Sequence, residues 1–390
     1  MDVKTAFLNG DLSKEIFMLQ PEGFIEEGSE HLVCKLKKSI YGLKQASRQW
    51  YLKFDKIITS NGFVENRLDE CIYLKFSGSK FIFLVLYIDD ILLASSDESL
   101  LHETKNFLSM NFEMKDLGEA SYVLGIEIHR DREKGLLGSS QKAYIEKVLK
   151  KFNMLQSNGD EVPVSKRDKL SREDCPKNDV ERAEMKDKPY ASVVGSIMYQ
   201  SDPSIAHWKA AKKVLRYMQR TKGHMLVYKR TDSLELVGYT DSDFAGCKDT
   251  SQSTSSFVFM MGGGVVAWKS AKQPSEYLAC YEATSHAMWL KNFIQDLKVV
   301  DSIEKPIQLF CDNKGAVFFC KNNKRSAGLK HMKVKYLLVR EKVREGLTTV
   351  DYINTTEMIA DPLNKEIPNN AFHRHVTNMG LLSSFEDSLV

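Results

Sequence analysis

The pattern of hydrophobic and polar positions is most distinctive between Phe81 and Ala94. Apolar, β-branched and aromatic residues fill this stretch, and only Asp89 and Asp90 interrupt it. Such a pattern predicts the two strands of a hairpin with the acid pair at its turn. Two adjacent charges in apolar surroundings are unfavourable without a partner, and a divalent cation such as Mg²⁺ would supply one. The alternative is a tight turn exposed to water, because aspartate is a common turn former.

Helical periodicity replaces the strand pattern on both sides of this hairpin. A predicted helix before the hairpin ends at Asn61-Gly62. Its apolar face consists of Trp50, Phe54, Ile57 and Ile58. After the hairpin, Ser95–Glu98 predicts a capping box at the start of a second helix, and residues 141–152 predict a third, amphipathic one.

Two later strands end in acids. Residues 236–240 lead into Asp241, and residues 307–311 lead into Asp312. Between them, the apolar residues around Gly262–Gly264 predict a hairpin. Acids at the carboxyl ends of strands in an α/β sheet lie at the edge where sites are usually built. For any one of these acids by itself, a helix cap or a solvated surface position is the alternative.

Composition restricts the class of protein. A length of 390 residues suggests two or three domains, and the net charge of +3 neither requires nor opposes a nucleic-acid partner. No apolar run approaches the ~20 residues of a membrane span, so we expect no membrane partner. Seven cysteines without paired C-x-x-C spacing predict free thiols in a reducing compartment. His373 and His375 are predicted to be surface histidines rather than zinc ligands.

Four blocks at the front of the chain resemble the reverse transcriptase of copia-type LTR retrotransposons. They occur in the order found in that family, and they are Met1–Gly10, Gln20–Phe24, Ile40–Tyr51 and Tyr87–Asp90. Segments in the rear of the chain resemble the ribonuclease H part of the same Pol polyprotein. The resemblance implies a fold of the α+β and α/β classes. It would comprise the palm and thumb of a right-hand polymerase, with the fingers largely missing, followed by a ribonuclease H-like domain.

The resemblance also implies a division into four segments. These are a reverse-transcriptase palm and thumb truncated at the N-terminus (1–155), a connection (156–235), a ribonuclease H-like domain (236–370) and a C-terminal tail (371–390). Residues 156–188 are charged and poor in large apolar side chains, which is typical of a solvated linker. Between Tyr199 and His207 the chain is shorter than the family pattern, which indicates an internal deletion.

In the front segment the resemblance assigns roles to named residues. Asp2, Asp89 and Asp90 would hold two Mg²⁺ ions for polymerisation. Nucleotide binding is assigned to Phe7, Gln45 and Lys115, and the primer grip to Leu124, Gly125 and Ile126. From the residues themselves, a core position is the favoured interpretation of Phe7. For Lys115, an exposed position on a strand edge is at least an equal alternative.

In the rear segment the resemblance points to four carboxylates, Asp241, Glu276, Asp312 and Asp361, which would hold two Mg²⁺ ions for RNA hydrolysis. Mn²⁺ is an alternative ion in both sites. Glu276 is the least secure of the four, because only Pro274 and Ser275 separate it from Gln273, where the family has a longer loop.

A basic run follows, which would contact the phosphates of a hybrid duplex. Its residues are Lys324, Arg325, Lys330, Lys333 and Lys335. The alternative is a solvated helix whose charges pair with Glu341 and Glu345.

The function implied by the resemblance is RNA-directed DNA synthesis together with cleavage of RNA in RNA–DNA hybrids. The expected partners are an RNA template, a DNA primer, an RNA–DNA hybrid and deoxynucleoside triphosphates, and the sequence sets no oligomeric state. The expected location is the cytoplasm, in a virus-like particle, or the nucleus. The competing hypotheses are a decayed or co-opted chain that binds nucleic acid without chemistry, and a remnant that does not fold. Truncation and internal deletion are expected to impair catalysis.

Overall fold

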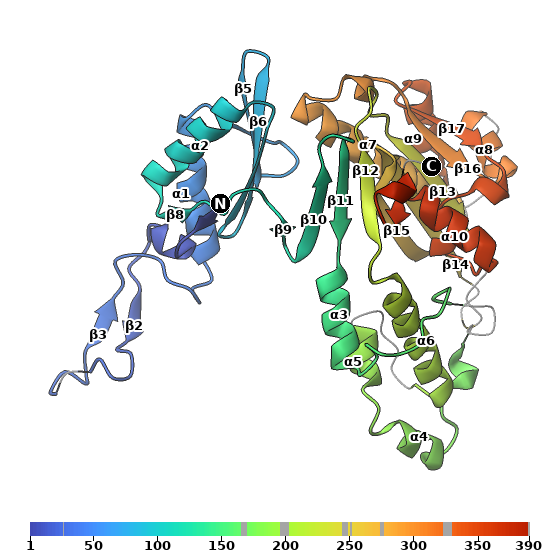
Figure 1. Ribbon diagram of the computed structural model, residues 1–390, viewed down its shortest axis with the longest axis horizontal. Helices are drawn as coiled ribbons and strands as arrows, with labels where there is room; N and C mark the ends of the chain where they lie inside the picture. The colour runs from blue at the N-terminus through green and yellow to red at the C-terminus, as the bar shows by residue number, and fades with distance from the viewer. Residues whose placement is uncertain are drawn as a thin grey trace. The chain divides into compact units, whose positions relative to one another are not determined.

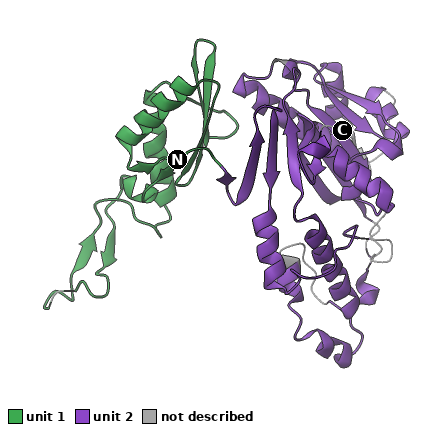
Figure 2. Cartoon of the chain, viewed as in Figure 1, with its two compact units in different colours: residues 1–120 green, residues 121–390 purple. Residues whose placement is uncertain are grey.

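The computed structural model describes residues 1–25, 27–164, 170–195, 203–243, 249, 252–273, 277–322 and 330–388. The chain forms two compact units, residues 1–120 and residues 121–390 (Figure 2). This boundary differs from the division into four segments made from the sequence, which stays a prediction. None of the helices in the described ranges is long and apolar enough to cross a membrane.

The first unit is built on an antiparallel sheet with the strand order β4-β5-β6-β7-β1-β8. Its strands are β1 (Asp2–Val3), β4 (Val64–Glu65), β5 (Ile72–Ser77), β6 (Lys80–Tyr87), β7 (Asp90–Ser95) and β8 (Met114–Lys115). A separate hairpin pairs β2 (Phe17–Leu19) with β3 (Val33–Lys35). The predicted hairpin around the acid pair is confirmed, because β6 and β7 pair from Ile82–Ser95 to Tyr87–Asp90.

Two helices, α1 (Ala46–Ser60) and α2 (Glu98–Asn111), complete the first unit with the short 3₁₀ helix η1 (Ala6–Asn9) (Figure 1). The predicted apolar face of α1 is confirmed, since Trp50, Phe54 and Ile58 are buried in the core of this unit. The capping box expected from Ser95 is wrong. Asp97 caps α2 instead, and its side chain accepts a hydrogen bond from the Leu100 amide at 2.9 Å.

The second unit contains an antiparallel sheet with the order β18-β12-β11-β10-β9. Its strands are β9 (Tyr122–Val123), β10 (Ile126–Asp131), β11 (Leu136–Ser140), β12 (Met225–Lys229) and β18 (Leu381–Leu382). Four helices gather at one end of the unit (Figure 1). They are α3 (Lys142–Lys151), α4 (Asp179–Met185), α5 (Tyr190–Gly195) and α6 (Ile205–Thr221). Met185 lies in the core they share, so part of the expected linker is packed.

The other sheet of the second unit has the order β15-β14-β13-β16-β17 and positions the rear acids. Its strands are β13 (Val237–Ser242), β14 (Ser253–Met261), β15 (Gly264–Gln273), β16 (Ile307–Cys311) and β17 (Thr348–Tyr352). β13, β16 and β17 are parallel, whereas β14 and β15 form the hairpin predicted around Gly262–Gly264. Antiparallel sheets and one mixed sheet, all combined with helices, confirm the expected α+β and α/β class.

Helices cover both faces of this sheet. On one face, α7 (Tyr277–Leu297), α8 (Lys314–Lys321) and α9 (Lys330–Arg344) bury Phe257, Phe259 and Leu309. On the other face, Val258 and Val265 pack against the segment before Asp361 and against the end of α10 (Asn369–Asn378).

The expected surface position of His375 is wrong, because this side chain is only 2% exposed. It follows the buried Phe372 by three residues on the inward face of α10.

Candidate active sites

The front acids are brought together by the backbone register of two neighbouring strands. Asp2 on β1 lies opposite Asp90 on β7. The Val3 amide donates to the Asp89 carbonyl at 2.8 Å, and the Ile91 amide donates to the Met1 carbonyl at 2.8 Å. The sheet therefore places the three predicted acids at one end of the β6–β7 hairpin.

The turn that carries Asp89 has a strained backbone and an anchor. Ile88 has a positive φ of 58°, a conformation that is uncommon for a β-branched residue. The indole Nε1–H of Trp50 donates to the Ile88 carbonyl at 2.6 Å, so α1 holds the turn from the core. The sequence predicted Trp50 only as a packing residue. A donor role could not be read from the helical period, which reports the face and not the partner.

The side chains of the front acids are less well gathered than their backbones. Asp90 is exposed, and Asp2 and Asp89 are half-buried. Within the described ranges, one group of three acids has ligand atoms within 4.8 Å of one another, and it lies in the second unit. A metal site at Asp2, Asp89 and Asp90 therefore stays a prediction.

The residues assigned to nucleotide binding lie in the same unit as these acids. Lys115 is exposed on β8, directly opposite Asp2. Phe7 is half-buried in η1, and its ring centroid is 4.7 Å from that of Tyr41. Gln45 precedes α1, and within the described part of the chain its Nε2 is buried without a hydrogen-bond partner. The three roles stay predictions.

The residues assigned to the primer grip form the turn between β9 and β10 in the second unit. Leu124 and Gly125 have φ angles of 52° and 79°, and two consecutive positive values are typical of a type I′ hairpin. Leu124 is 56% exposed, and a Cβ added at Gly125 would meet nothing within 4 Å. Ile126 begins β10 opposite Val123. The turn thus presents an apolar tip that is open to a ligand.

The rear acids converge through tertiary structure. β13 and β16 are parallel neighbours, with Thr240 opposite Cys311, so the carboxyl ends that carry Asp241 and Asp312 lie side by side. Asp361 begins the 3₁₀ helix η6 (Asp361–Leu363). The ligand atoms of these three acids all lie within 4.8 Å of one another, and Asp241 and Asp361 are buried.

Two serines fasten the η6 turn to the sheet. Ser256 Oγ on β14 donates to the Ala360 carbonyl at 3.1 Å, and Ser270 Oγ on β15 donates to the Leu363 carbonyl at 2.8 Å. The Lys365 amide also donates to the Asp361 carbonyl at 3.0 Å. The position of Asp361 therefore depends on contacts with residues about a hundred positions earlier in the chain.

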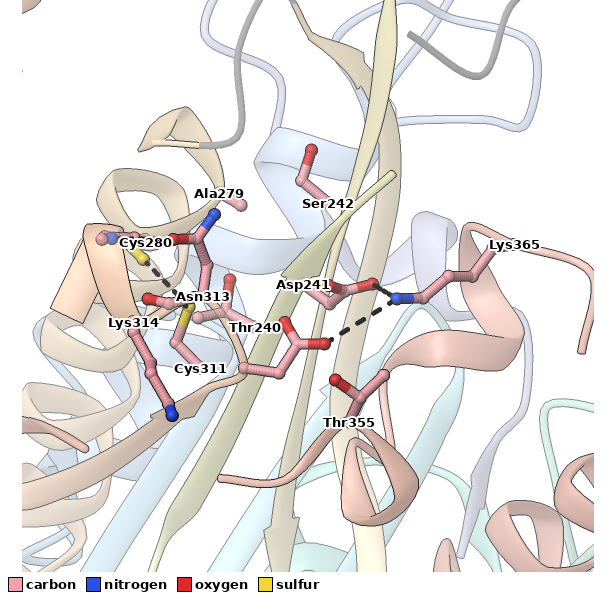
Figure 3. Close-up of a pocket in the computed structure, with 13 residues that line it drawn as sticks. Thr240, Asp241, Ser242, Ala279, Cys280, Cys311, Asn313, Lys314, Thr355 and Lys365 are labelled. Carbon is pink, nitrogen blue, oxygen red and sulfur yellow. Dashed lines mark hydrogen bonds and ion pairs between the residues drawn. The ribbon is translucent and has the colours of Figure 1, made fainter. Parts of the chain in front are cut away.

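Two polar side chains that the sequence analysis missed complete this group. Lys365 Nζ lies 2.9 Å from Asp361 Oδ1 and 3.1 Å from Asp241 Oδ2, and Figure 3 shows its side chain extending toward Asp241. Asn364 Nδ2 donates to Asp241 Oδ2 at 2.7 Å. In the sequence, only the spacing of four residues between Asp361 and Lys365 could have indicated that these two side chains lie close together.

Burial and charge act in opposite directions on these groups. Burial by itself would raise the pKa of Asp241, but the Lys365 ammonium and the hydrogen bond from Asn364 outweigh it and hold that pKa below its usual range. Burial and then the charge of Asp241 raise the pKa of Asp312. Burial raises the pKa of Asp361 to about 7, with Lys365 opposing the rise and the charge of Asp241 adding to it. The three acids therefore share one electrostatic environment.

Two of the rear acids, Asp241 and Asp312, line a cavity of about 570 Å³ (Figure 3). Its lining includes Asp241, Asp312, Lys314, Thr355 and Lys365. The donor set suits a hard divalent cation, because it consists of carboxylate oxygens at the edge of a solvent-accessible space. Asp361 Oδ1 accepts no hydrogen bond of normal geometry from the described residues, but it forms an ion pair with the Lys365 ammonium at 2.9 Å.

Several predicted site residues lie outside the described residues or have side chains that are not described. Glu276, Lys324 and Arg325 belong to the first kind, and Lys330 and Lys333 on α9 belong to the second. Lys335 is the one residue of the basic run whose side chain is described, and α9 also carries Lys342. Lys335 Nζ lies 4.9 Å from the centroid of the Tyr281 ring, and Lys342 pairs with Glu345 at 2.8 Å. Lys342 is not one of the residues of the run, so both interpretations of the run stay predictions.

The chain is similar to known sequences over most of its length. The family described as reverse transcriptase (RNA-dependent DNA polymerase) matches residues 1–166. The retrovirus-related Pol polyprotein from transposon TNT 1-94 of Nicotiana tabacum is 40% identical, and the match covers 95% of this chain and 30% of that polyprotein. The chain therefore spans less than a third of the length of this relative.

Two solved structures are also similar. The foamy viral protease-reverse transcriptase in complex with dsDNA matches with a TM-score of 0.42 and 12% identity, and the match covers 90% of this chain and 70% of that chain. The LC11-RNase H1 in complex with RNA/DNA hybrid matches with a TM-score of 0.26 and 19% identity, and the match covers 35% of this chain and 99% of that chain.

Proposed function

Because this chain belongs to the copia-type retrotransposon Pol family, we propose that it combines RNA-directed DNA synthesis with cleavage of RNA in RNA–DNA hybrids. The observation that best supports the proposal is the group of Asp241, Asp312 and Asp361 beside a cavity. Its two strand-end acids lie at the edge of the sheet where sites are usually built.

In the rear site, Asp241, Asp312 and Asp361 would hold Mg²⁺, with Glu276 as a fourth ligand by family position. A bound pair of ions would lower the pKa of an attacking water and stabilise the leaving 3′ oxygen. The chain's own residues prepare this site. Lys365 and Asn364 favour the ionised form of Asp241, and the cavity would give a phosphodiester access to Asp241 and Asp312.

In the front site, Asp2, Asp89 and Asp90 would hold the ions that assist attack of a primer 3′ hydroxyl on the α-phosphate of a deoxynucleoside triphosphate. Phe7 would exclude a 2′-hydroxyl, Gln45 and Lys115 would contact the nucleotide, and the turn at residues 124–126 would position the primer. The backbone register of β1 and β7 supports the assignment of the three acids.

A second candidate is a decayed or co-opted chain that binds nucleic acid without catalysing either reaction. The observation in its favour is the front site, where Asp90 is exposed and the three carboxylates are not gathered as the rear ones are. The two candidates can be distinguished by measurement, because the second predicts that duplex binds while neither hybrid cleavage nor primer extension occurs.

The test uses the purified chain with Mg²⁺, a labelled RNA–DNA hybrid and a primed template. We expect Asp312→Asn to reduce hybrid cleavage by about 10³-fold and to leave primer extension unchanged, because it removes a preorganised charge from one site. Asp90→Asn should do the reverse. Asp351→Asn is the matched control, because Asp351 lies on β17 outside the acid group, where it pairs with Lys321 of α8 at 2.7 Å. Binding without turnover in either assay would support the second candidate.

A further inference from the structure

The Lys365 ammonium lies among the three rear carboxylates. It is 2.9 Å from Asp361, 3.1 Å from Asp241 and 3.9 Å from Asp312. The four side chains differ in exposure. The Lys365 side chain is 28% exposed, whereas those of Asp241, Asp361 and Asp312 are 3%, 6% and 12% exposed. The ammonium is thus closest to the two most buried carboxylates, those of Asp361 and Asp241.

We propose that Lys365 is a tethered competitor of the metal, whose ammonium occupies the space between Asp241 and Asp361 and must leave before an ion can bridge these two carboxylates. The inference rests on the proposed metal site. It assigns to Lys365 a positioning role that sets how tightly, and in which order, divalent ions bind.

The distances support competition rather than joint occupation. Mg²⁺ binds carboxylate oxygens at about 2.1 Å and keeps near-octahedral geometry. An ion on the oxygens that face Lys365 would therefore lie close to the ammonium, and two cations repel strongly where little water screens them. Lys365 and a bridging ion cannot share these oxygens.

The lysine is also built to leave. Its side chain is the most exposed of the four, and it lines the cavity. Its backbone is fixed by the hydrogen bond from its amide to the Asp361 carbonyl, so a change of side-chain rotamer is sufficient. Because Lys365 is farther from Asp312 than from the other acids, an ion between Asp241 and Asp312 meets less competition than one that uses Asp361.

The direct test is calorimetric titration of the metal-free full chain with MgCl₂. We expect Lys365→Met to tighten the apparent affinity by about tenfold, because the competing charge is removed. Lys314→Met is the matched control. Lys314 lines the same cavity, but its ammonium lies 4.8 Å from the centroid of the Tyr352 ring. The affinity of Lys314→Met for Mg²⁺ should stay within about twofold of that of the wild type.

Unchanged or weaker Mg²⁺ affinity in Lys365→Met overturns the inference, as does an equal gain in Lys314→Met. If neither the wild type nor Lys365→Met binds Mg²⁺, the proposed metal site itself fails, and the inference fails with it. Binding that is equal in the two proteins overturns the role of Lys365 alone.

A measurement on the wild type keeps the inference testable if Lys365→Met does not fold. An amine-reactive reagent with mass-spectrometric readout reports the accessibility of each lysine. We expect saturating Mg²⁺ to increase the labelling rate of Lys365 several-fold and to leave that of Lys314 unchanged. Labelling of Lys365 that is unchanged or slower while Mg²⁺ binds would overturn the proposed displacement.

Discussion

The two groups of acids are assembled in different ways. In the first unit, two antiparallel neighbours bring Asp2 beside Asp90, and the register is fixed by backbone hydrogen bonds at an exposed hairpin tip. In the second unit, two parallel strands end side by side, and a short turn from far along the chain adds Asp361. The first arrangement aligns backbones, whereas the second gathers side chains.

The two groups of acids also differ in burial, and burial decides whether a carboxylate needs a counter-charge from the protein. Exposed carboxylates such as that of Asp90 are solvated by water and require no protein partner. The buried Asp241 and Asp361 require a counter-charge, and Lys365 supplies it. A site that gathers acids before the metal arrives therefore has to neutralise them. We conclude that preorganisation and competition for the ion go together in the rear site.

Among the substitutions that test this difference, the largest effect is expected at Trp50, whose side chain holds the turn of the β6–β7 hairpin. Trp50→Phe removes the donor to the Ile88 carbonyl and part of a buried side chain. We expect a loss of about 1–3 kcal/mol in the free energy of unfolding, since a partly buried hydrogen bond and part of a buried side chain are both lost. Hydrogen exchange should then quicken in residues 81–94 and not in residues 253–273.

The control for this substitution is Trp289→Phe. Trp289 lies on α7 and is 44% exposed, so its replacement should leave exchange in both segments unchanged. Unaltered protection of residues 81–94 in Trp50→Phe would show that the register of β1 and β7 holds the turn without help from α1.

A smaller effect is expected at the anchor of the rear turn. Ser256 is buried, and Ser256→Ala removes its hydrogen bond to the Ala360 carbonyl. We expect a loss of about 1 kcal/mol, which thermal unfolding would measure, together with a weaker affinity for Mg²⁺. Ser285→Ala is the control, because its hydroxyl bonds only to the Tyr281 carbonyl of its own helix among the described contacts. Equal Mg²⁺ affinity in the two variants would mean that Ser270 suffices to place Asp361.

The smallest effect concerns pH and the helix behind the rear site. Burial, and then the charge of Arg374, lowers the pKa of His375 below its ordinary value of 6.5. The unfolded chain therefore binds a proton more readily, and the second unit should lose stability as the pH falls below about 6.5. His375→Asn should flatten this dependence in urea titrations at pH 5 and pH 7. His373→Asn is the control, because His373 is exposed. If the free energy of unfolding changed with pH equally in His375→Asn and in the wild type, the expectation would be contradicted.

Local patterns predicted the elements well because each depends on neighbours in sequence. The alternation from Phe81 to Tyr87 predicted a strand, and the burial of Ile82, Leu84 and Leu86 on one face confirms it. The strands that end at Asp241 and Asp312 were predicted in the same way. Their pairing as parallel neighbours was not predicted, because it depends on contacts between segments about 70 residues apart.

The missed features depend on contacts between distant segments. Strand β18 near the C-terminus joins a sheet with β12, which the composition of a tail or linker does not indicate. Lys365 was not predicted because a lysine after Asp-Pro-Leu-Asn is ordinarily solvated. Its role arises from the fold, which brings Asp241 within 3.1 Å of its ammonium. The burial of His375 likewise depends on what α10 packs against.

The central claim is that the fold gathers Asp241, Asp312 and Asp361 into a metal site in which Lys365 holds the place of an ion. The most direct measurement is the anomalous density of crystals of the full chain soaked in MnCl₂. The account predicts a peak bounded by the three carboxylates, with the Lys365 side chain turned away from Asp361. Saturating MnCl₂ with no peak at these acids, or a peak bridging Asp241 and Asp361 with Lys365 still in contact with both, would contradict it.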